Sequence, residues 1–322
     1  MRKLLLTLIL FLLPWQVNAA PLTDAEILEH RMILYQKTEA STQVPWYYIA
    51  AIDQFERSIR HVRNDLPKPD GITGYYITQE KWAGYTNPNP KDKNPLSIGI
   101  FGGIGVDGNG DGKADKDNDE DLLFAVASYI SQYGVNDHSF RIALWNYYQR
   151  DKSVNAIMTN VKLFRKYNRI DLIEKAFPIP KSHHYSYNST WGAGRGWGGR
   201  RSHEGTDIFA SYGTPVYAVA YGVVELKGWN KFGGWRIGIR DINNTYHYYA
   251  HLNGFAKDIN VGDIVEPGTV VGSVGSSGYG PPGTSGKFPP HLHFGMYKDS
   301  GKNEWSFDPF PHLKNWERNS KK

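Results

Sequence analysis

Two kinds of hydrophobic pattern divide the chain into a helical first part and a β-rich second part. From Leu22 to about Ala176, apolar residues recur at the three-to-four-residue spacing of amphipathic helices. From residue 181 onwards, short β-branched and aromatic runs alternate with turn residues, which predicts an antiparallel β region. The helices expected are 24–41, 44–62, 119–134, 139–151 and 153–167, and the strand-bearing runs are 214–226, 233–241, 245–252, 263–275 and 291–297. The Gly-, Pro- and Asn-rich residues 64–119 interrupt the helical pattern.

The first residues have the pattern of a secretory signal peptide. Arg2 and Lys3 give a basic start, Leu4 to Leu13 form an apolar run, and Ala19 ends a small-residue cleavage pattern. Ten apolar residues are too few to span a bilayer, which takes about 20. We therefore expect cleavage after Ala19 and a secreted protein with no stable membrane insertion.

The length of 322 residues favours two domains. We place the signal peptide at residues 1–19, a helical domain at 20–178 and a β domain at 179–322. Two prolines between Phe177 and Lys181 predict a short linker there. The fold class expected is α+β with two domains, and we expect a monomer.

Composition narrows the chemistry. The chain has no cysteine, so disulfides and thiolate ligands are excluded, and an exported chain of this size relies on its core and on metals. The net charge of +5 becomes +3 when Arg2 and Lys3 are removed, which gives no indication of nucleic-acid binding. Aromatic residues make up 14% of the chain, and aromatic faces suit sugar rings and extended peptides as well as cores.

Five residues of the β region carry most of the chemical information: His203 and Asp207 in RSHEGTD, His251 in YYAHL, and His291 and His293 in HLHF. Imidazole nitrogens and carboxylate oxygens are ligands of Zn²⁺, and catalytic zinc sites use three protein ligands. Side chains alternate along a strand, so the two histidines of HLHF point the same way while the leucine between them points to the other face. One imidazole of this pair can bind a metal while the other remains available for proton transfer.

These motifs resemble the lysostaphin/LytM-type zinc metallopeptidases of family M23, which cut peptide bonds in bacterial peptidoglycan. The resemblance runs from Trp191 to Leu313 and includes HEGTD, GTPVYAVAYGVV, YYAHL, VGDIVEPGTVVGSVGSSG and HLHF. It implies that His203, Asp207 and His293 bind zinc and that His291 and His251 are catalytic. The chain has no HExxH motif, so the helical zinc proteases are not its template.

The two catalytic histidines have different expected tasks. Zinc lowers the pKa of a bound water and polarises the scissile carbonyl. His291 is placed to take the proton of that water, and His251 to hydrogen-bond the oxyanion and later protonate the amine. The sequence does not decide this division, and the two residues can share the work.

Other polar residues near these motifs receive different roles. We expect Glu204 to be a surface residue that faces away from the metal. His247 can share the face of His251 by strand alternation, but we favour a structural role. His183, His184 and His312 have no partner pattern and are expected to be ordinary surface or packing residues. The segments WGAGRGWGG and GWNKFGGW form either loops that wall the substrate groove or tight β turns.

The helical domain resembles the lysozyme-like fold of lytic transglycosylases. VPWYYIAAIDQFERS matches the helix that carries their catalytic glutamate and places Glu56 at that position. The Gly-Leu-Met-Gln-type segment of active members is absent, and NPLSIGIFGGIG stands near its place. We therefore favour a substrate-positioning or structural domain over a glycan-cleaving one.

The loop after this segment has the start of a calcium-binding pattern. Asp107, Asn109, Asp111 and Asp115 supply oxygen atoms, and Gly112 allows a sharp turn. The twelfth position is Asn118 instead of a bidentate glutamate, so the loop is not a complete EF-hand. Bound Ca²⁺ and a solvated acidic turn remain as alternatives.

The sequence thus predicts an exported zinc endopeptidase that acts on the peptide stems of peptidoglycan. The whole chain most resembles the members of family M23 that cut L-Ala–D-Glu bonds in the spore cortex of Bacillus-type bacteria, so we expect the protein in the cell wall or spore cortex. Cleavage of D-Ala–diaminopimelate cross-links is the alternative bond. A catalytically silent LytM-like wall-binding regulator and a glycan-cleaving enzyme that uses Glu56 are the alternative functions.

Overall fold

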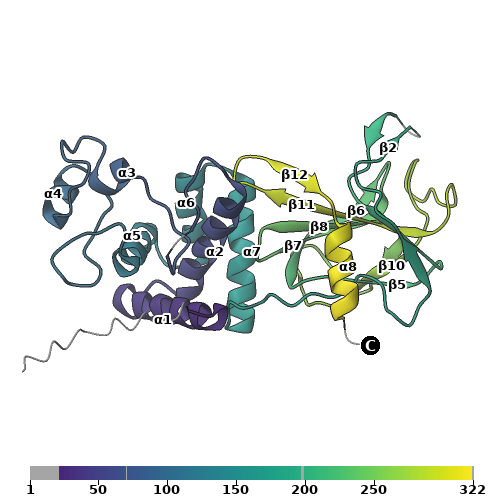
Figure 1. Ribbon diagram of the computed structural model, residues 1–322, viewed down its shortest axis with the longest axis horizontal. Helices are drawn as coiled ribbons and strands as arrows, with labels where there is room; N and C mark the ends of the chain where they lie inside the picture. Colours follow the sequence, from purple (N-terminus) through teal and green to yellow (C-terminus); the bar gives the residue numbers. More distant parts are fainter. Residues whose placement is uncertain (1–21, 70, 197–198, 321–322) are drawn as a thin grey trace, which may run out of the picture.

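The computed structural model describes residues 22–69, 71–196 and 199–320. Figure 1 shows an elongated molecule with helices at one end and a large sheet at the other. The predicted signal peptide, residues 1–19, lies outside the described residues. In the described part of the chain, no helix combines the length and the apolar character that crossing a membrane requires.

The helical end confirms the five helices predicted from periodicity. They are α1 (Asp24–Thr42), α2 (Trp46–Val62), α5 (Asp119–Ser131), α6 (Asp137–Tyr148) and α7 (Asp151–Tyr167), and the irregular stretch between α2 and α5 adds the short α3 (Gln79–Ala83) and α4 (Pro95–Ile100). Several helices begin at side-chain caps, for example Thr23 for α1 and Asn118 for α5. The third predicted helix ends at Ser131, three residues before the expected end.

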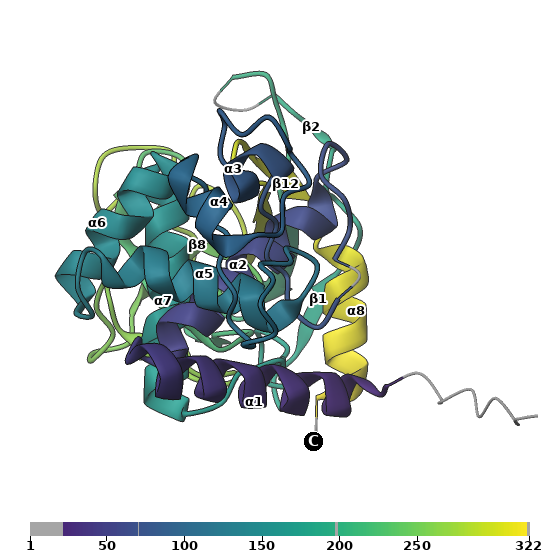
Figure 2. The ribbon, with the colours of Figure 1, turned by 90° about the vertical axis from the view of Figure 1, so that its left-hand side faces the viewer.

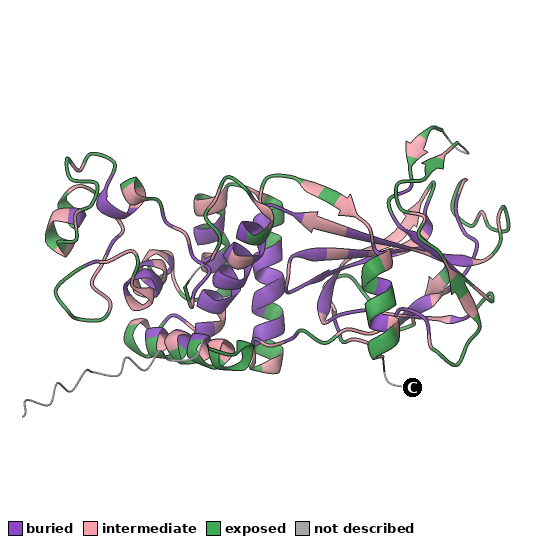
Figure 3. Ribbon diagram, in the orientation of Figure 1, coloured by how far each residue is buried: buried purple, intermediate pink, exposed green. Residues whose placement is uncertain are grey.

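Helix α2 forms the centre of this end because one wide stripe of it is apolar. It packs against α7 along its length, and Ile49, Phe55 and Leu163 are buried between them. Figure 3 shows that both helices are largely buried, whereas Figure 2 shows α1 lying across the outside of the bundle. Glu56, on α2, is therefore in the interior of the protein.

The second part is an antiparallel sheet, as predicted. Its main strand order is β1-β4-β11-β8-β7-β6-β9, with β12 beside β11 and with β10 pairing β5 and β8. The strands are β1 (Tyr185–Tyr187), β4 (Thr206–Ala210), β5 (Pro215–Tyr217), β6 (Gly222–Asn230), β7 (Gly234–Asp241), β8 (Thr245–Phe255), β9 (Ile264–Val265), β10 (Val270–Val274), β11 (His291–Asp299) and β12 (Glu304–Phe307). A separate hairpin joins β2 (Gly194–Arg195) to β3 (Arg201–Ser202).

One face of the sheet is covered by a hydrophobic core, and the other carries the candidate site. Leu292, Phe294 and Met296 of β11 point into a core that a C-terminal helix, α8 (Phe310–Asn319), helps to close. Side chains at the odd-numbered positions of β11 point to the other face, which is the face of the candidate site. The hydrophobic pattern did not predict α8. Its buried residues are Leu313 and Trp316, and two apolar positions are too few to give a clear helical periodicity.

The helical and β parts are more closely joined than a linker implies. Phe177 and Ile179, in the predicted linker, are buried in the core of the sheet, and the amide of Tyr217 donates to the carbonyl of Pro178 at 2.9 Å. Conversely, Val223 and Ile242 of the β part belong to the apolar core of the helices. The junction is therefore a packed interface.

Candidate functional site

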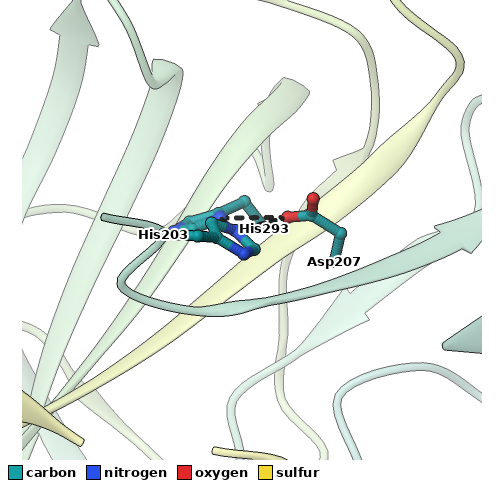
Figure 4. A group of neighbouring side chains, drawn as sticks. All are labelled: His203, Asp207 and His293. Atoms are coloured by element: carbon teal, nitrogen blue, oxygen red, sulfur yellow. Dashed lines mark hydrogen bonds and ion pairs between the residues drawn. The ribbon is translucent and has the colours of Figure 1, made fainter. Parts of the chain in front are cut away.

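Pairing of β4 with β11 creates a group of three metal-binding side chains. Asp207 lies directly opposite His293 in the register of these strands, and His203 lies in the turn that leads into β4. The Nε2 atom of His203 is 2.9 Å from Nδ1 of His293 and 3.1 Å from Oδ1 of Asp207, and His293 Nδ1 is 3.1 Å from the same oxygen. Figure 4 shows the three side chains converging from these segments.

The three donor atoms fit a zinc ion. A tetrahedral ion with ligand bonds of about 2.0–2.1 Å has ligand atoms about 3.3 Å apart, close to the separations found here. Two imidazoles and one carboxylate are also the ligand types that Zn²⁺ accepts. Among the residues that the structure describes, His203, Asp207 and His293 form the one group of three or more such ligands that gathers in this way.

Burial strengthens the electrostatics of this group. Burial alone raises the pKa of Asp207, but hydrogen bonds with His203 and His293 outweigh it and hold the pKa well below its usual range. Burial also lowers the pKa of His293. A carboxylate and a neutral imidazole are the forms that bind a metal.

Gly205 allows the turn before β4 to pass close to the ligands. A Cβ atom at this position would lie 2.6 Å from Cε1 of His293 and 2.7 Å from its Nε2. Any side chain there would push the imidazole away. The glycine of HEGTD is therefore needed for close approach, and it leaves Nδ1 of His293 as the atom that faces the metal site.

His251 and His291 lie beside the metal group. The ring centroid of His251 is 4.9 Å from that of His291 and 5.9 Å from that of His293. The Nε2 atom of His291 is 3.7 Å from Oδ1 of Asp207. The structure thus brings together all five residues that the motifs singled out.

Hydrogen bonds fix the orientation of both imidazoles. Nδ1 of His251 is 2.8 Å from the carbonyl oxygen of Ser277, and Nδ1 of His291 is 2.9 Å from that of Pro289. A carbonyl oxygen only accepts, so each Nδ1 carries the proton and each Nε2 is left as a base. Burial lowers the pKa of both residues, to about 3 for His251, where the neighbouring histidines add to the effect.

A cleft of about 1050 Å³ opens over this group. Its walls include Asn230 at the end of β6, Phe232 from the turn after β6, and Tyr279 from the segment before β11. Arg195 and Arg201 of the β2–β3 hairpin complete it. Of the segments WGAGRGWGG and GWNKFGGW, four described residues line the cleft, namely Arg195, Asn230, Phe232 and Gly233.

Arg195 lies in this cleft but outside the motifs from which the site residues were predicted. Its Nη2 atom is 3.1 Å from both ring nitrogens of His203 and also hydrogen-bonds Asp207. Arg201 is held by the hydroxyl of Tyr279, and its guanidinium lies 5.4 Å from the centre of that ring. The hairpin therefore brings two positive charges to the cleft. The signal in the sequence was the run of arginines just before HEGTD.

Comparison with known proteins agrees with this geometry. Residues 201–309 match peptidase family M23. The chain is 61% identical over 320 residues to the L-Ala–D-Glu endopeptidase of Bacillus subtilis (strain 168), which covers 99% of this chain and 98% of that protein. The chain belongs to peptidase family M23. It is thus a metallopeptidase with a His–Asp–His metal site.

More distant relatives match a smaller part of the chain. Lysostaphin of Staphylococcus simulans is 36% identical over 114 residues, which are 35% of this chain and 21% of lysostaphin. The solved catalytic domain of lysostaphin from that organism is 31% identical, with a TM-score of 0.32, and the match covers 41% of this chain and 93% of the domain.

His247 lies on the opposite face from the family's metal site. Its Nε2 atom is 3.1 Å from Oδ2 of Asp241, and its ring stacks on Phe294 in the core. Between the pairs Trp235–Leu252 and Ile237–Tyr249, β8 contains one residue more than β7. This bulge, with a φ of 60° at His251, reverses the alternation, so the face expected for His247 was wrong and the structural role fits.

The remaining polar candidates lie outside the metal group. Glu204 lines the rim of the cleft, where the hydroxyl of Tyr297 donates to it at 3.2 Å. His183 and His184 are exposed. His312 lies on α8, where it contacts the rings of Phe307 and Trp316.

Glu56 lies in a separate, small apolar pocket inside the helical end. The hydroxyl of Tyr148 donates to its Oε1 at 2.5 Å, and Tyr75, Tyr129 and Tyr147 also line the pocket. Burial raises the pKa of Glu56 to about 7, and the hydrogen bond from Tyr148 opposes this rise. The carboxyl is therefore poised to exchange a proton near neutral pH.

The predicted calcium loop is ordered in another way. The carboxylate of Asp107 accepts hydrogen bonds from the amides of Gly110, Asp111 and Gly112, and Asp115 pairs with Lys93. Asn109 accepts from the amide of Asp111 at 2.9 Å. These oxygens bind their own loop, so the geometry gives calcium no support here.

Proposed function

We propose that this chain is a zinc endopeptidase that hydrolyses the L-Ala–D-Glu bond in the peptide stems of peptidoglycan. The observation that carries the proposal is the His–Asp–His group with two further imidazoles turned toward it. Similarity along the whole length to a Bacillus subtilis L-Ala–D-Glu endopeptidase supports the choice of bond.

His203, Asp207 and His293 would hold the zinc ion. When bound, the ion supplies a water of lowered pKa and polarises the carbonyl of the scissile bond. His291, with its Nε2 atom 3.7 Å from Asp207, accepts the proton of the attacking water. His251, on the other side of His291, also presents an unprotonated Nε2, so it donates to the oxyanion and protonates the leaving amine after Nε2 has taken up a proton released by the attacking water. Hydrogen bonds to Ser277 and Pro289 keep both rings in position for these transfers.

The charge of the cleft agrees with this bond. In a peptidoglycan stem, D-Glu continues through its side-chain carboxyl, so its α-carboxylate remains free, one carbon from the scissile nitrogen. Arg195, beside the metal ligands, is placed to bind that carboxylate. Glycyl-glycine bonds carry no such charge.

Mass spectrometry of the fragments released from purified wall tests the proposal. We expect stems cut after L-Ala, with zinc and activity both lost in His203→Ala, and activity lost with zinc retained in His291→Ala. His183→Ala, which changes an exposed histidine, is the matched control and keeps both. Release of uncrosslinked tetrapeptides instead would identify cleavage of D-Ala–diaminopimelate bonds. A zinc-free protein without activity would identify a silent regulator.

We also propose that the protein is exported and acts as a monomer in the cell wall or spore cortex. The signal-peptide pattern of residues 1–19 and the nature of the polymer support this location. Fractionation of sporulating cells, with detection of the full and the processed chain, tests it. A protein that stays unprocessed in the cytoplasm would contradict the proposal.

Glu56 supports a second candidate function, cleavage of the glycan. A buried carboxyl with a pKa of about 7 in a pocket walled by tyrosines can protonate a glycosidic oxygen as an acid and then, as a base, take the proton of the sugar hydroxyl that closes the anhydro ring. The altered NPLSIGIFGGIG segment still favours a lysozyme-like domain that positions the substrate. Anhydro-muropeptides that disappear in Glu56→Gln, but not in His291→Ala, would establish glycan cleavage.

A further inference from the structure

A second large cleft lies on the face of the sheet opposite the metal group. It has a volume of about 1100 Å³ and is bounded by α2, the strands β8, β11 and β12, and α8. In Figure 1 these elements occupy the middle of the molecule. The side chains that matter to its chemistry are Arg57, Lys175, Asp241, His247, Lys298 and Trp305. None of them belongs to the peptidase site.

The one carboxylate among these side chains is already neutralised. Oδ2 of Asp241 is 2.8 Å from Nζ of Lys175 and 3.1 Å from Nε2 of His247, while Oδ1 accepts from the amides of Asn243 and Thr245. Asp241 is fully buried, and these four partners occupy its lone pairs. Its negative charge is therefore shared first with Lys175 and His247, and it acts at longer range on Lys298.

Two further cations of the cleft lack a close carboxylate of their own. Nζ of Lys298 donates to the carbonyl of Asn243 at 2.7 Å and to the hydroxyl of Thr245 at 3.2 Å, and both acceptors are uncharged. Arg57 lies 3.9 Å from Asp53, but that carboxylate is bound more closely, at 2.9 Å, by Arg31. The cleft therefore has an excess of positive charge.

The excess of positive charge affects the histidines that line the cleft. The pKa of both His61 and His312 is lowered, first by burial and then by neighbouring cations that include Lys298. Two buried polar atoms, Nε of Arg57 and Nδ1 of His247, have no hydrogen-bond partner in the described part of the chain. A positive field beside unsatisfied polar atoms is typical of a site that binds an anion or ordered water.

Aromatic side chains also line the cleft, and Trp305 is the cross-strand partner of Lys298. Trp305 is 40% exposed, and Phe307, His312 and Trp316 continue the wall toward α8. An exposed indole offers a flat apolar surface that suits a sugar ring. Anion-binding groups thus lie beside a surface that suits a ring, which indicates a ligand that carries both a negative charge and a ring.

We propose that this cleft binds a carboxylate carried on a wall sugar, namely the muramoyl-L-alanine that the peptidase reaction leaves on the glycan. The identity of the ligand rests on the proposed function. Hydrolysis of the L-Ala–D-Glu bond adds water, so the alanine keeps a new carboxylate and D-Glu leaves as a free amine. Lys298 and Arg57 bind the carboxylate, and Trp305 lies against the sugar. The helical end and the sheet thereby hold a processed strand together while the other face of the sheet acts on the next stem.

Calorimetric titration of N-acetylmuramoyl-L-alanine into the full chain carrying His203→Ala tests this inference. That background removes the metal site, which could otherwise bind carboxylates itself. We expect binding that weakens at least tenfold when the ligand's carboxylate is converted to a methylamide, and at least tenfold when Lys298→Gln is added. Lys302→Gln, which removes an exposed charge paired with Asp65 outside the cleft, changes the affinity less than twofold.

Trp305→Ala provides a second variant, because an exposed side chain can be removed without unfolding the protein. It should weaken binding of the muramoyl ligand several-fold and leave binding of N-acetyl-L-alanine unchanged. Equal affinity for the acid, its methylamide and inorganic phosphate, or equal loss in Lys298→Gln and Lys302→Gln, would overturn the inference. Because the titrated chain is inactive, these outcomes are independent of the bond that the active protein cuts. Cleavage of another bond would overturn the proposed function alone.

Discussion

At the scale of single residues, distance from the metal group decides which side chains are close enough to bind a substrate there. Arg195 approaches the ligands from the β2–β3 hairpin and not from the strands that carry the motifs. Its hydrogen bond with Asp207 holds the guanidinium at the floor of the cleft. Its charge therefore lies 3.1 Å from the ring nitrogens of the metal ligand His203.

We expect Arg195→Gln to lower kcat/KM on stems with a free D-Glu α-carboxylate by about 10–100-fold, since a hydrogen bond to a charged group contributes about 1.5–3 kcal/mol. On stems whose α-carboxylate is amidated, the change should be less than about threefold. Kinetics on the two soluble stems measure this difference. Arg200→Gln, in the same hairpin but exposed, is the control. An equal loss on both stems would assign Arg195 a structural role.

Glu56 makes stability depend on pH. Its folded pKa of about 7 lies above the ordinary carboxyl value of 4.5, so the folded state holds this proton more tightly than the unfolded state does. The stabilisation is fully present below about pH 4.5 and is lost as pH rises through about 7, up to about 3 kcal/mol. Urea unfolding of the wild type and Glu56→Gln at pH 5 and 7.5 should show a steeper loss in the wild type. Parallel pH dependence in both would contradict this account.

At the scale of secondary-structure elements, the sequence predicted those helices and strands that bury one clear apolar face. Helices such as α2 and strands such as β8 have the spacing of apolar residues that their packing requires, and both were predicted. Helix α8 was missed because its buried side is narrow. Strand alternation failed at His247, because a bulge depends on pairing with β7, which the sequence of β8 does not contain.

The metal ligands were predictable for a different reason. HEGTD and HLHF hold short-range spacing that β4 and β11 convert directly into a metal group. The second cleft arises from contacts between segments far apart in the chain, with α2 and β12 separated by more than 200 residues. No local pattern records such contacts.

Helix α8 closes the core side of the sheet with few residues, so each should matter. Trp316 is 6% exposed and lies against Phe294 and His247. We expect Trp316→Ala to lower the free energy of unfolding by about 3–5 kcal/mol. Trp191→Ala, at a 40% exposed position, should cost less than about 1 kcal/mol. Chemical denaturation measures both, and similar losses would show that α8 is peripheral.

At the scale of the whole molecule, ion pairs as well as apolar contacts connect the helices to the sheet. Arg150, just before α7, lies 2.7 Å from Asp299 at the end of β11. Lys152 lies 2.7 Å from Glu304 on β12. The Asp299 side chain is 2% exposed, whereas that of Lys152 is 54% exposed. The first pair is therefore much less screened by solvent.

We expect Arg150→Gln to destabilise the protein by about 2 kcal/mol, because it leaves the buried Asp299 charge without its partner. Lys152→Gln should cost less than about 1 kcal/mol. Urea midpoints and slopes, followed by tryptophan fluorescence and circular dichroism, measure both effects. A shared core also predicts one transition in the wild type. Two separate transitions would show that the helical end and the sheet unfold independently.

The backbone conformation of His251 lowers the stability of the fold but is needed for activity. Its φ of 60° suits glycine far better than a side chain with a Cβ atom, yet this conformation turns the imidazole toward the metal site. We expect His251→Gly to be more stable than His251→Ala by about 1 kcal/mol, as measured by thermal unfolding, although both are inactive. Equal stabilities would mean that the bulge tolerates alanine. Selection of variants for thermal stability alone would therefore favour replacement of His251 by glycine. Selection for peptidase activity would keep the histidine.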